Sequence, residues 1–105
     1  WGDGSIVRDY IYVNDLATII LDLIEKSLMN EIFNIGSGKG HSINQIIEII
    51  KNEITDFPVK YQEFRKVDVP YAVLNIDKLK SKIEYNLVRI EEGIKRTFNW
   101  LKDTL

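Results

Sequence analysis

The feature that most constrains this chain is a set of three glycines at alternate positions within EIFNIGSGKGHSINQIIEII, residues 31–50. An apolar run at 32–35 precedes the glycines and predicts a short strand. Ser42 and Gln45 follow them with the spacing of a capping box, in which the hydroxyl and the amide satisfy free N–H groups at the start of a helix. A strand, a glycine-rich turn and a helix in this order have the layout of a phosphate-binding loop.

Neither common phosphate-loop pattern fits Gly36, Gly38 and Gly40. A Walker loop needs a hydroxyl residue directly after its lysine to hold magnesium, whereas Lys39 is followed by a glycine. A dinucleotide loop, GxGxxG, needs its third glycine one position later, and the acidic residue expected about 20 positions on is at best Glu53, inside the helix. We interpret these glycines as a strand-to-helix turn that uses positive φ angles, although the helix N-terminus could still attract an anion.

Short apolar runs alternate with amphipathic segments along the rest of the chain. IVRDYIYV, residues 6–13, predicts a strand, and Asn14 or Asp15 is placed to cap a helix with a core-facing apolar stripe. A second such helix follows Ser42, and a third is predicted over 91–102. The first stripe consists of Leu16, Ile19, Ile20, Leu23 and Ile24, and the shorter elements expected are a strand over 59–64 and a helix over 77–83.

These elements predict a mixed α/β fold. Strands this short do not build a tidy doubly wound sheet, so we expect a small domain of short strands and about three main amphipathic helices. The chain has 105 residues, which is one domain's worth and enough to bury a single core. We therefore treat residues 1–105 as one domain.

Composition excludes several classes of protein. A hydrophobic content of 45% and a charged content of 29% are ordinary for a globular domain. A net charge of −2 provides no basic field to draw in nucleic acid or an anionic membrane, and no apolar run approaches the roughly 20 residues that span a bilayer. The lack of cysteine excludes disulfides and thiolate chemistry, and a cytoplasmic location is expected.

Two arginines are the main candidates for binding a ligand. Arg8 lies in the first predicted strand, and Arg65 precedes Asp68 by three residues. An arginine fork suits phosphate oxygens, and an aspartate can accept hydrogen bonds from two neighbouring ribose hydroxyls. The same residues could instead be an exposed arginine and a surface ion pair of little value. The sole histidine, His41, is interpreted as a solvated loop residue, and no catalytic triad, paired-carboxylate motif or metal-ligand spacing is evident.

Four segments occur in order along the chain: GDGSIVRDYIYVNDLA, EIFNIGSGKGHSINQIIEII, RKVDVP and IEEGIKRTFNWL. Together they resemble the C-terminal part of the NAD-dependent sugar-nucleotide epimerase/dehydratases, which are extended short-chain dehydrogenase/reductases, most closely those of the UDP-glucose 4-epimerase type. The resemblance covers essentially the whole chain. It implies the smaller, nucleotide-sugar-binding domain of such an enzyme, without the N-terminal Rossmann domain that holds NAD.

The resemblance also implies roles for particular residues. Arg8 matches the family arginine that contacts the diphosphate, and Tyr10 lies in the same binding strand. Arg65 and Asp68 match the pair that contacts the diphosphate and the nucleoside ribose. Tyr71 stands one position early relative to a tyrosine that lies near the substrate in some members. By the same resemblance, the glycine turn is a structural feature of the small domain.

The family's catalytic groups have no counterpart here. Its cofactor loop GxxGxxG is absent, and no tyrosine of this chain has the lysine four residues on that the catalytic YxxxK motif requires. The chain begins at Trp1 without a methionine, and we expect it to be a fragment that binds no NAD and is inactive alone, within a parent that uses NAD and a UDP-sugar. The alternative is a non-catalytic α/β module that docks a partner protein. In either case the wide apolar stripes predict exposed hydrophobic surface and a homodimer.

Overall fold

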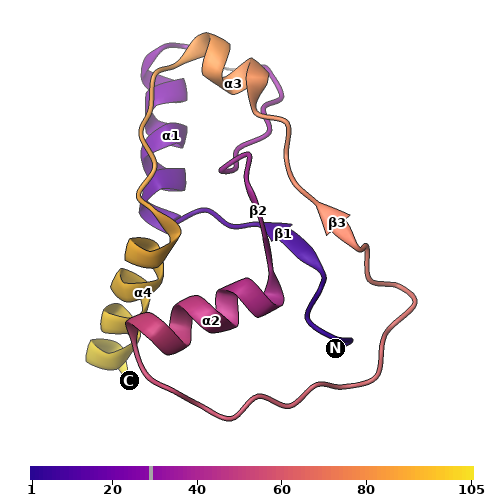
Figure 1. The fold of residues 1–105 in the computed structure, drawn as a ribbon. Helices are drawn as coiled ribbons and strands as arrows, with labels where there is room; N and C mark the ends of the chain where they lie inside the picture. Colours follow the sequence, from indigo (N-terminus) through magenta and orange to yellow (C-terminus); the bar gives the residue numbers. More distant parts are fainter. Residues whose placement is uncertain (29) are drawn as a thin grey trace.

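The computed structural model describes residues 1–28 and 30–105 (Figure 1). The predicted mixed α/β fold is confirmed, with four helices and three short strands in the described residues. The elements in chain order are β1 (Val7–Asp9), α1 (Val13–Glu25), β2 (Gly40–Ser42), α2 (Ile43–Glu53), β3 (Tyr71–Ala72), α3 (Asp77–Lys82) and α4 (Ile90–Thr104).

The strands form one mixed sheet with β1 at its centre. Their order is β2-β1-β3, and β1 pairs antiparallel with β2 and parallel with β3. In this register Arg8 lies opposite His41 on one side and Ala72 on the other. A parallel pair needs a long crossover, and Figure 1 shows the segment after α2 sweeping around the molecule before it reaches β3.

The predicted start of α1 is wrong by a few residues. β1 ends at Asp9, and α1 begins at Val13 with Tyr12 at the N-cap position and no side-chain cap. Asp15 lies in the first turn, where its carboxylate accepts a hydrogen bond from the backbone N–H of Val88 at 2.9 Å. It therefore fixes the chain before α4 instead of capping its own helix. The capping box of Ser42 and Gln45 at α2 is confirmed.

Two predicted strands, over 32–35 and 59–64, do not form. Neither segment pairs with the central strand, because β1 takes its two partners from 40–42 and 71–72. The strand near the glycines begins at the third of them, Gly40, whereas the sequence predicted a strand before the first. The brief helix predicted over 77–83 is present as α3.

The core is small and centres on α1 and α3. It consists of the buried side chains of Ile19, Leu23, Leu79 and Ile83. Phe33 and Ile35, from the run that forms no strand, pack against this cluster together with four other partly buried residues. These two apolar side chains therefore contribute to the core. Strand propensity alone cannot distinguish residues that pack in a core from residues that pair in a sheet.

Much of the apolar surface of the helices remains uncovered. In α1 only one side of the predicted stripe is buried, because Ile20 and Ile24 are 42% and 53% exposed. Leu21 is exposed as well, and in α4 so is Trp100. The expected exposed hydrophobic surface is present, and surface of this kind marks a contact with another protein or domain.

Because these faces are uncovered, we expect the 105-residue chain to form dimers at tens of micromolar. Replacing the exposed Leu21 with lysine should shift the equilibrium toward monomer, since it places a charge on the α1 face. Analytical ultracentrifugation measures the change, with Asn99→Lys on α4 as a charge-matched control. A wild-type chain that sediments as a monomer would contradict this expectation.

Candidate functional site

Arg8 joins two segments that are far apart in the sequence. It is the central residue of β1, and its Nη1 donates hydrogen bonds to the carbonyl oxygens of Val7 at 2.8 Å and Val69 at 2.7 Å. The backbone N–H of Val7 also donates to the carbonyl of Pro70 at 2.9 Å. Val69 directly follows Asp68, so the structure brings Arg8 alongside the second predicted binding segment.

Arg65 and Asp68 form a two-pronged ion pair across a tight turn. Nε and Nη2 of Arg65 donate to the two carboxylate oxygens of Asp68 at 2.9 Å and 2.8 Å, the fork geometry typical of arginine and carboxylate. The Asp68 side chain is 14% exposed and that of Arg65 is 48% exposed. The ion pair that the sequence left open is therefore present, and it leaves other N–H groups of the guanidinium at the surface.

Trp1 lies against this pair. The Cζ atom of Arg65 is 5.1 Å from the centre of the indole ring, within the range of a cation–π contact. The indole is mostly exposed, as are the side chains of Phe64 and Tyr71. Tyr71 lies in β3, opposite Val7. The sequence offered no spacing signal for Trp1, since its contact with Arg65 depends on the folded chain.

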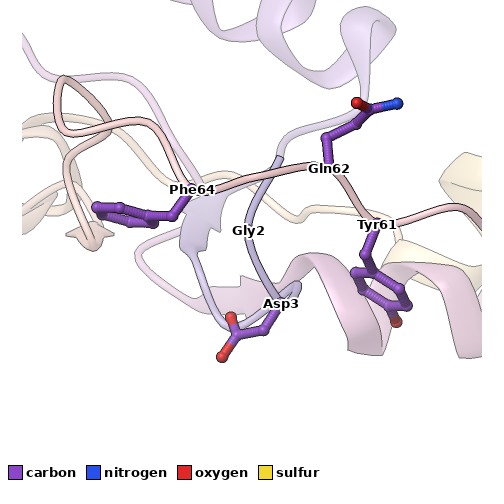
Figure 2. Close-up of a pocket in the computed structure, with 5 residues that line it drawn as sticks. All are labelled: Gly2, Asp3, Tyr61, Gln62 and Phe64. Atoms are coloured by element: carbon purple, nitrogen blue, oxygen red, sulfur yellow. The ribbon is translucent and has the colours of Figure 1, made fainter.

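A shallow depression beside the same turn does not add a second binding site. It has a volume of about 500 Å³ and is lined by Gly2, Asp3, Tyr61, Gln62 and Phe64. Figure 2 shows these side chains spread apart, with Phe64 and Tyr61 on opposite sides of Gly2 and Gln62 pointing away from Asp3. They do not converge on a common point.

The glycine turn binds a carboxylate of its own chain. One carboxylate oxygen of Asp9, Oδ1, accepts hydrogen bonds from the backbone N–H of Ser37 at 2.7 Å and from its hydroxyl at 2.6 Å. The other, Oδ2, accepts from the N–H groups of Gly38 at 2.9 Å and Leu74 at 3.3 Å. Burial acts to raise the pKa of Asp9, but these hydrogen bonds outweigh it and hold the pKa below its ordinary value.

The three glycines serve different purposes. Gly38 has a positive φ of 70°, as predicted, but Gly36 and Gly40 do not. A Cβ at Gly36 would lie 2.7 Å from Oδ2 of Asp9, and one at Gly40 would lie 2.5 Å from Cγ1 of Val7. The positive-φ explanation is therefore wrong for these two positions, which need glycine because other atoms approach closely.

His41 and Tyr10 are placed differently from their predictions. His41 lies in β2 opposite Arg8 and is partly buried, so it is not a solvated loop residue. Its Nδ1 is buried without a hydrogen-bond partner among the described residues. Tyr10 follows β1 and is not part of the strand. Both residues line a groove of about 730 Å³ whose apolar walls come largely from α2 and α4, including Ile46, Ile50, Ile54, Ile94, Phe98 and Leu101.

Residues 1–28 and 30–105 contain neither a cluster of metal-ligating side chains nor a helix that could cross a membrane. No group of three or more histidine, cysteine or acidic side chains in these ranges could hold a metal ion. Of the four helices described, none is long and apolar enough to cross a membrane.

Comparison with known proteins matches this architecture. The NAD dependent epimerase/dehydratase family matches residues 1–36. UDP-glucuronate 4-epimerase of Thermodesulfobacterium geofontis is 40% identical over the whole chain, which spans 33% of that protein. The matches make the chain similar to the C-terminal part of epimerases of this family. The resemblance found in the sequence is thereby confirmed.

Two solved epimerase structures share the fold. UDP-glucose 4-epimerase of Thermotoga maritima, solved with UDP-glucose, has a TM-score of 0.84 and 36% identity over 99% of this chain and 34% of its own. UDP-N-acetylglucosamine 4-epimerase of Methanobrevibacter ruminantium, in complex with UDP-N-acetylmuramic acid, has a TM-score of 0.87 and 30% identity. The match covers 100% of this chain and 34% of that epimerase. The chain thus spans about a third of the length of these epimerases.

We expect Asp9→Asn to lower the free energy of unfolding of this chain at neutral pH by about 1–3 kcal/mol, because the donors from Ser37, Gly38 and Leu74 lose their charged acceptor. Since the folded pKa of Asp9 is lowered, its contribution is present above the unfolded pKa near 3.8 and is lost as pH falls through the folded value. Wild type should therefore lose more stability than Asp9→Asn below about pH 4.

Urea unfolding followed by circular dichroism at several pH values measures both effects. Asp103→Asn, at the exposed end of α4, is the matched control and should change stability by less than about 0.5 kcal/mol. Equal stability of wild type and Asp9→Asn at neutral pH would show that the four hydrogen bonds carry no net stabilisation.

Proposed function

We propose that this chain is the nucleotide-sugar-binding part of an NAD-dependent sugar epimerase of the UDP-glucose 4-epimerase type. In this role Arg8 and Arg65 bind the diphosphate and Asp68 binds the ribose hydroxyls. The main supporting observation is the hydrogen bond from Arg8 to the carbonyl of Val69, which joins the two segments. The T. maritima epimerase, solved with UDP-glucose, supports the class of ligand.

The free hydrogen-bonding capacity of these residues suits such a ligand. Among the described residues only Nη1 of Arg8 is hydrogen-bonded to protein, so its Nε and Nη2 remain for phosphate oxygens. Arg65 keeps its Nη1 edge beyond the pair with Asp68. A carboxylate has about four lone-pair sites, and Asp68 uses two of them on Arg65, which leaves acceptors for two ribose hydroxyls.

The two tyrosines have a weaker place in this assignment. Tyr71 is exposed in β3, next to the strand that carries Arg8, and could contact the base or the sugar from there. Tyr10 lines the groove beside α2 and α4. We propose both as substrate neighbours without a defined hydrogen bond.

NAD does not fit the residues of this chain. The glycine turn donates its N–H groups from Ser37 and Gly38 to Asp9, so they are not available to a pyrophosphate. The chain also has no YxxxK sequence. We propose that an NAD-binding Rossmann domain elsewhere in the full-length protein supplies the cofactor site and the catalytic residues, and that this chain contributes binding and orientation of the substrate.

A second candidate function is a non-catalytic module that docks a partner protein. The exposed apolar face of α1, with Ile20, Leu21 and Ile24, is the observation that favours it. Titration with UDP distinguishes the two functions, because a docking module would not respond to millimolar UDP.

We expect Arg8→Ala and Arg65→Ala each to raise the KM for UDP-galactose by about ten-fold or more, since each removes a charge-assisted contact of about 1.5–3 kcal/mol. The assay follows UDP-galactose epimerisation by the protein expressed from its complete coding sequence. Arg96→Ala on α4, where the arginine pairs with Glu92, is the matched control and should leave KM within about two-fold.

Two results would overturn these assignments separately. An unchanged KM in both the Arg8 and the Arg65 variants would refute the proposed binding residues. A full-length protein that neither binds UDP nor acts on any UDP-sugar would refute the proposed function as a whole.

A further inference from the structure

Arg8 and Asp9 hold the two ends of the β3 segment. Arg8 donates to the carbonyl of Val69, which precedes β3, and Asp9 accepts from the N–H of Leu74, which follows it. Adjacent residues in a strand point to opposite faces of the sheet. The two side chains therefore fix β3 against β1 from both faces and at both ends, although the strand itself pairs over only two residues, Tyr71 and Ala72.

Asp9 also fixes the other neighbour of β1. Its carboxylate accepts from Ser37 and Gly38, just before β2, at distances of 2.6 to 2.9 Å. Gly36 leaves room for this carboxylate, because a Cβ at that position would meet Oδ2 of Asp9. A single side chain thus ties β1 to the segments on both of its sides, and Arg8 is the next residue in the strand.

We propose that Asp9 is a positioning residue that sets the separation between Arg8 and the Arg65–Asp68 pair, and thereby the affinity for a nucleoside diphosphate. This inference rests on the proposed function. When the anchor at Leu74 is lost, β3 can shift along β1. Val69 and the turn that carries Arg65 then move relative to Arg8, so the two guanidinium groups no longer match the spacing of two phosphates.

Asparagine cannot replace Asp9 in this role. Each of the two carboxylate oxygens accepts from two donors, Oδ1 from Ser37 twice and Oδ2 from Gly38 and Leu74. An amide has only one acceptor oxygen. With its oxygen in the Oδ1 position, the amide leaves Gly38 and Leu74 facing an NH₂ group, and the anchor at Leu74 is lost. With its oxygen in the Oδ2 position, the Ser37 donors are lost and the bond to Leu74 no longer has a charged acceptor, which weakens it.

A double-mutant cycle tests the inference in the protein expressed from its complete coding sequence. The dissociation constant for UDP is measured by calorimetry for wild type, Asp9→Asn, Arg8→Ala and the double variant. If Asp9 acts through the placement of Arg8, Asp9→Asn raises the constant about ten-fold in wild type and less than about two-fold in the Arg8→Ala background. A merely structural role would give the same factor in both backgrounds.

Leu79→Ala is the control for lost stability, because Leu79 is buried in the core between α1 and α3. It should lower the melting temperature and leave UDP binding within about two-fold of wild type. If Asp9→Asn does not fold, Ser37→Ala serves instead. It removes one of the two donors that hold Oδ1 and so loosens the carboxylate whose Oδ2 anchors Leu74; it should raise the constant about three-fold, again only when Arg8 is present.

The outcomes separate this inference from the proposed function. One result refutes the role of Asp9 alone. Wild type binds UDP, and the Asp9→Asn substitution either leaves the dissociation constant unchanged or raises it by the same factor with and without Arg8. Asp9 is then not a positioning residue, and the proposed function stands. If wild type does not bind millimolar UDP, the proposed function fails and this inference fails with it.

Discussion

The hydrogen bonds to the Asp9 carboxylate are the interaction on which the sheet depends. Strands of three, three and two residues provide few backbone hydrogen bonds, and such short pairings are marginal by themselves. Burial adds little, because both residues of β3 are exposed and those of β1 are only partly buried. Hydrogen bonds to a charged acceptor are stronger than those between neutral groups. The Asp9 carboxylate, which accepts four such hydrogen bonds, therefore stabilises a sheet that the hydrophobic core does not cover.

The core and the sheet are separate centres of packing. The buried cluster lies around Ile19, Leu23, Leu79 and Ile83, from α1 and α3 and the residue after α3. In Figure 1 these two helices lie together at one end of the molecule, away from β3 and the loop that leads into it. Apart from Tyr10, the predicted ligand-binding residues lie in the sheet and in that loop. Their geometry is thus set by local polar contacts, such as the one from Arg8 to Val69, and only indirectly by the hydrophobic core.

Much of the helical structure could be predicted from the sequence, because its signals are local. The capping box of Ser42 and Gln45 and the periodic apolar positions of α1 lie within one or a few turns of each other. The strands could not be predicted as well, because a strand is defined by a partner that is distant in the sequence. The run at 32–35 has strand-like residues, yet β1 pairs with 40–42. The sequence pattern alone does not show which of these two segments pairs with β1.

The candidate site shows the same division. Arg8, Arg65 and Asp68 could be named from motifs, and the three-residue spacing of the last two allows the ion pair that is present. Asp9 could not be recognised, since its partners Ser37 and Leu74 are 28 and 65 residues away. Sequence reasoning therefore identified the groups with ligand chemistry and missed the residue that fixes the strand beneath them.

The Arg65–Asp68 pair explains how a site can be preorganised without being blocked. The pair uses only one edge of the guanidinium, and Trp1 lies against its face, so the group is held in plane with another edge free. A diphosphate that approaches this free edge need not break the ion pair, and Asp68 retains lone pairs for hydroxyl donors. If the ligand had to open the ion pair, binding would cost two charge-assisted hydrogen bonds. It would also separate Arg65 from the Asp68 carboxylate, whose side chain is only 14% exposed. The observed geometry avoids that penalty, because the ion pair orients the arginine while the carboxylate keeps free acceptors for the hydroxyls of the proposed ligand.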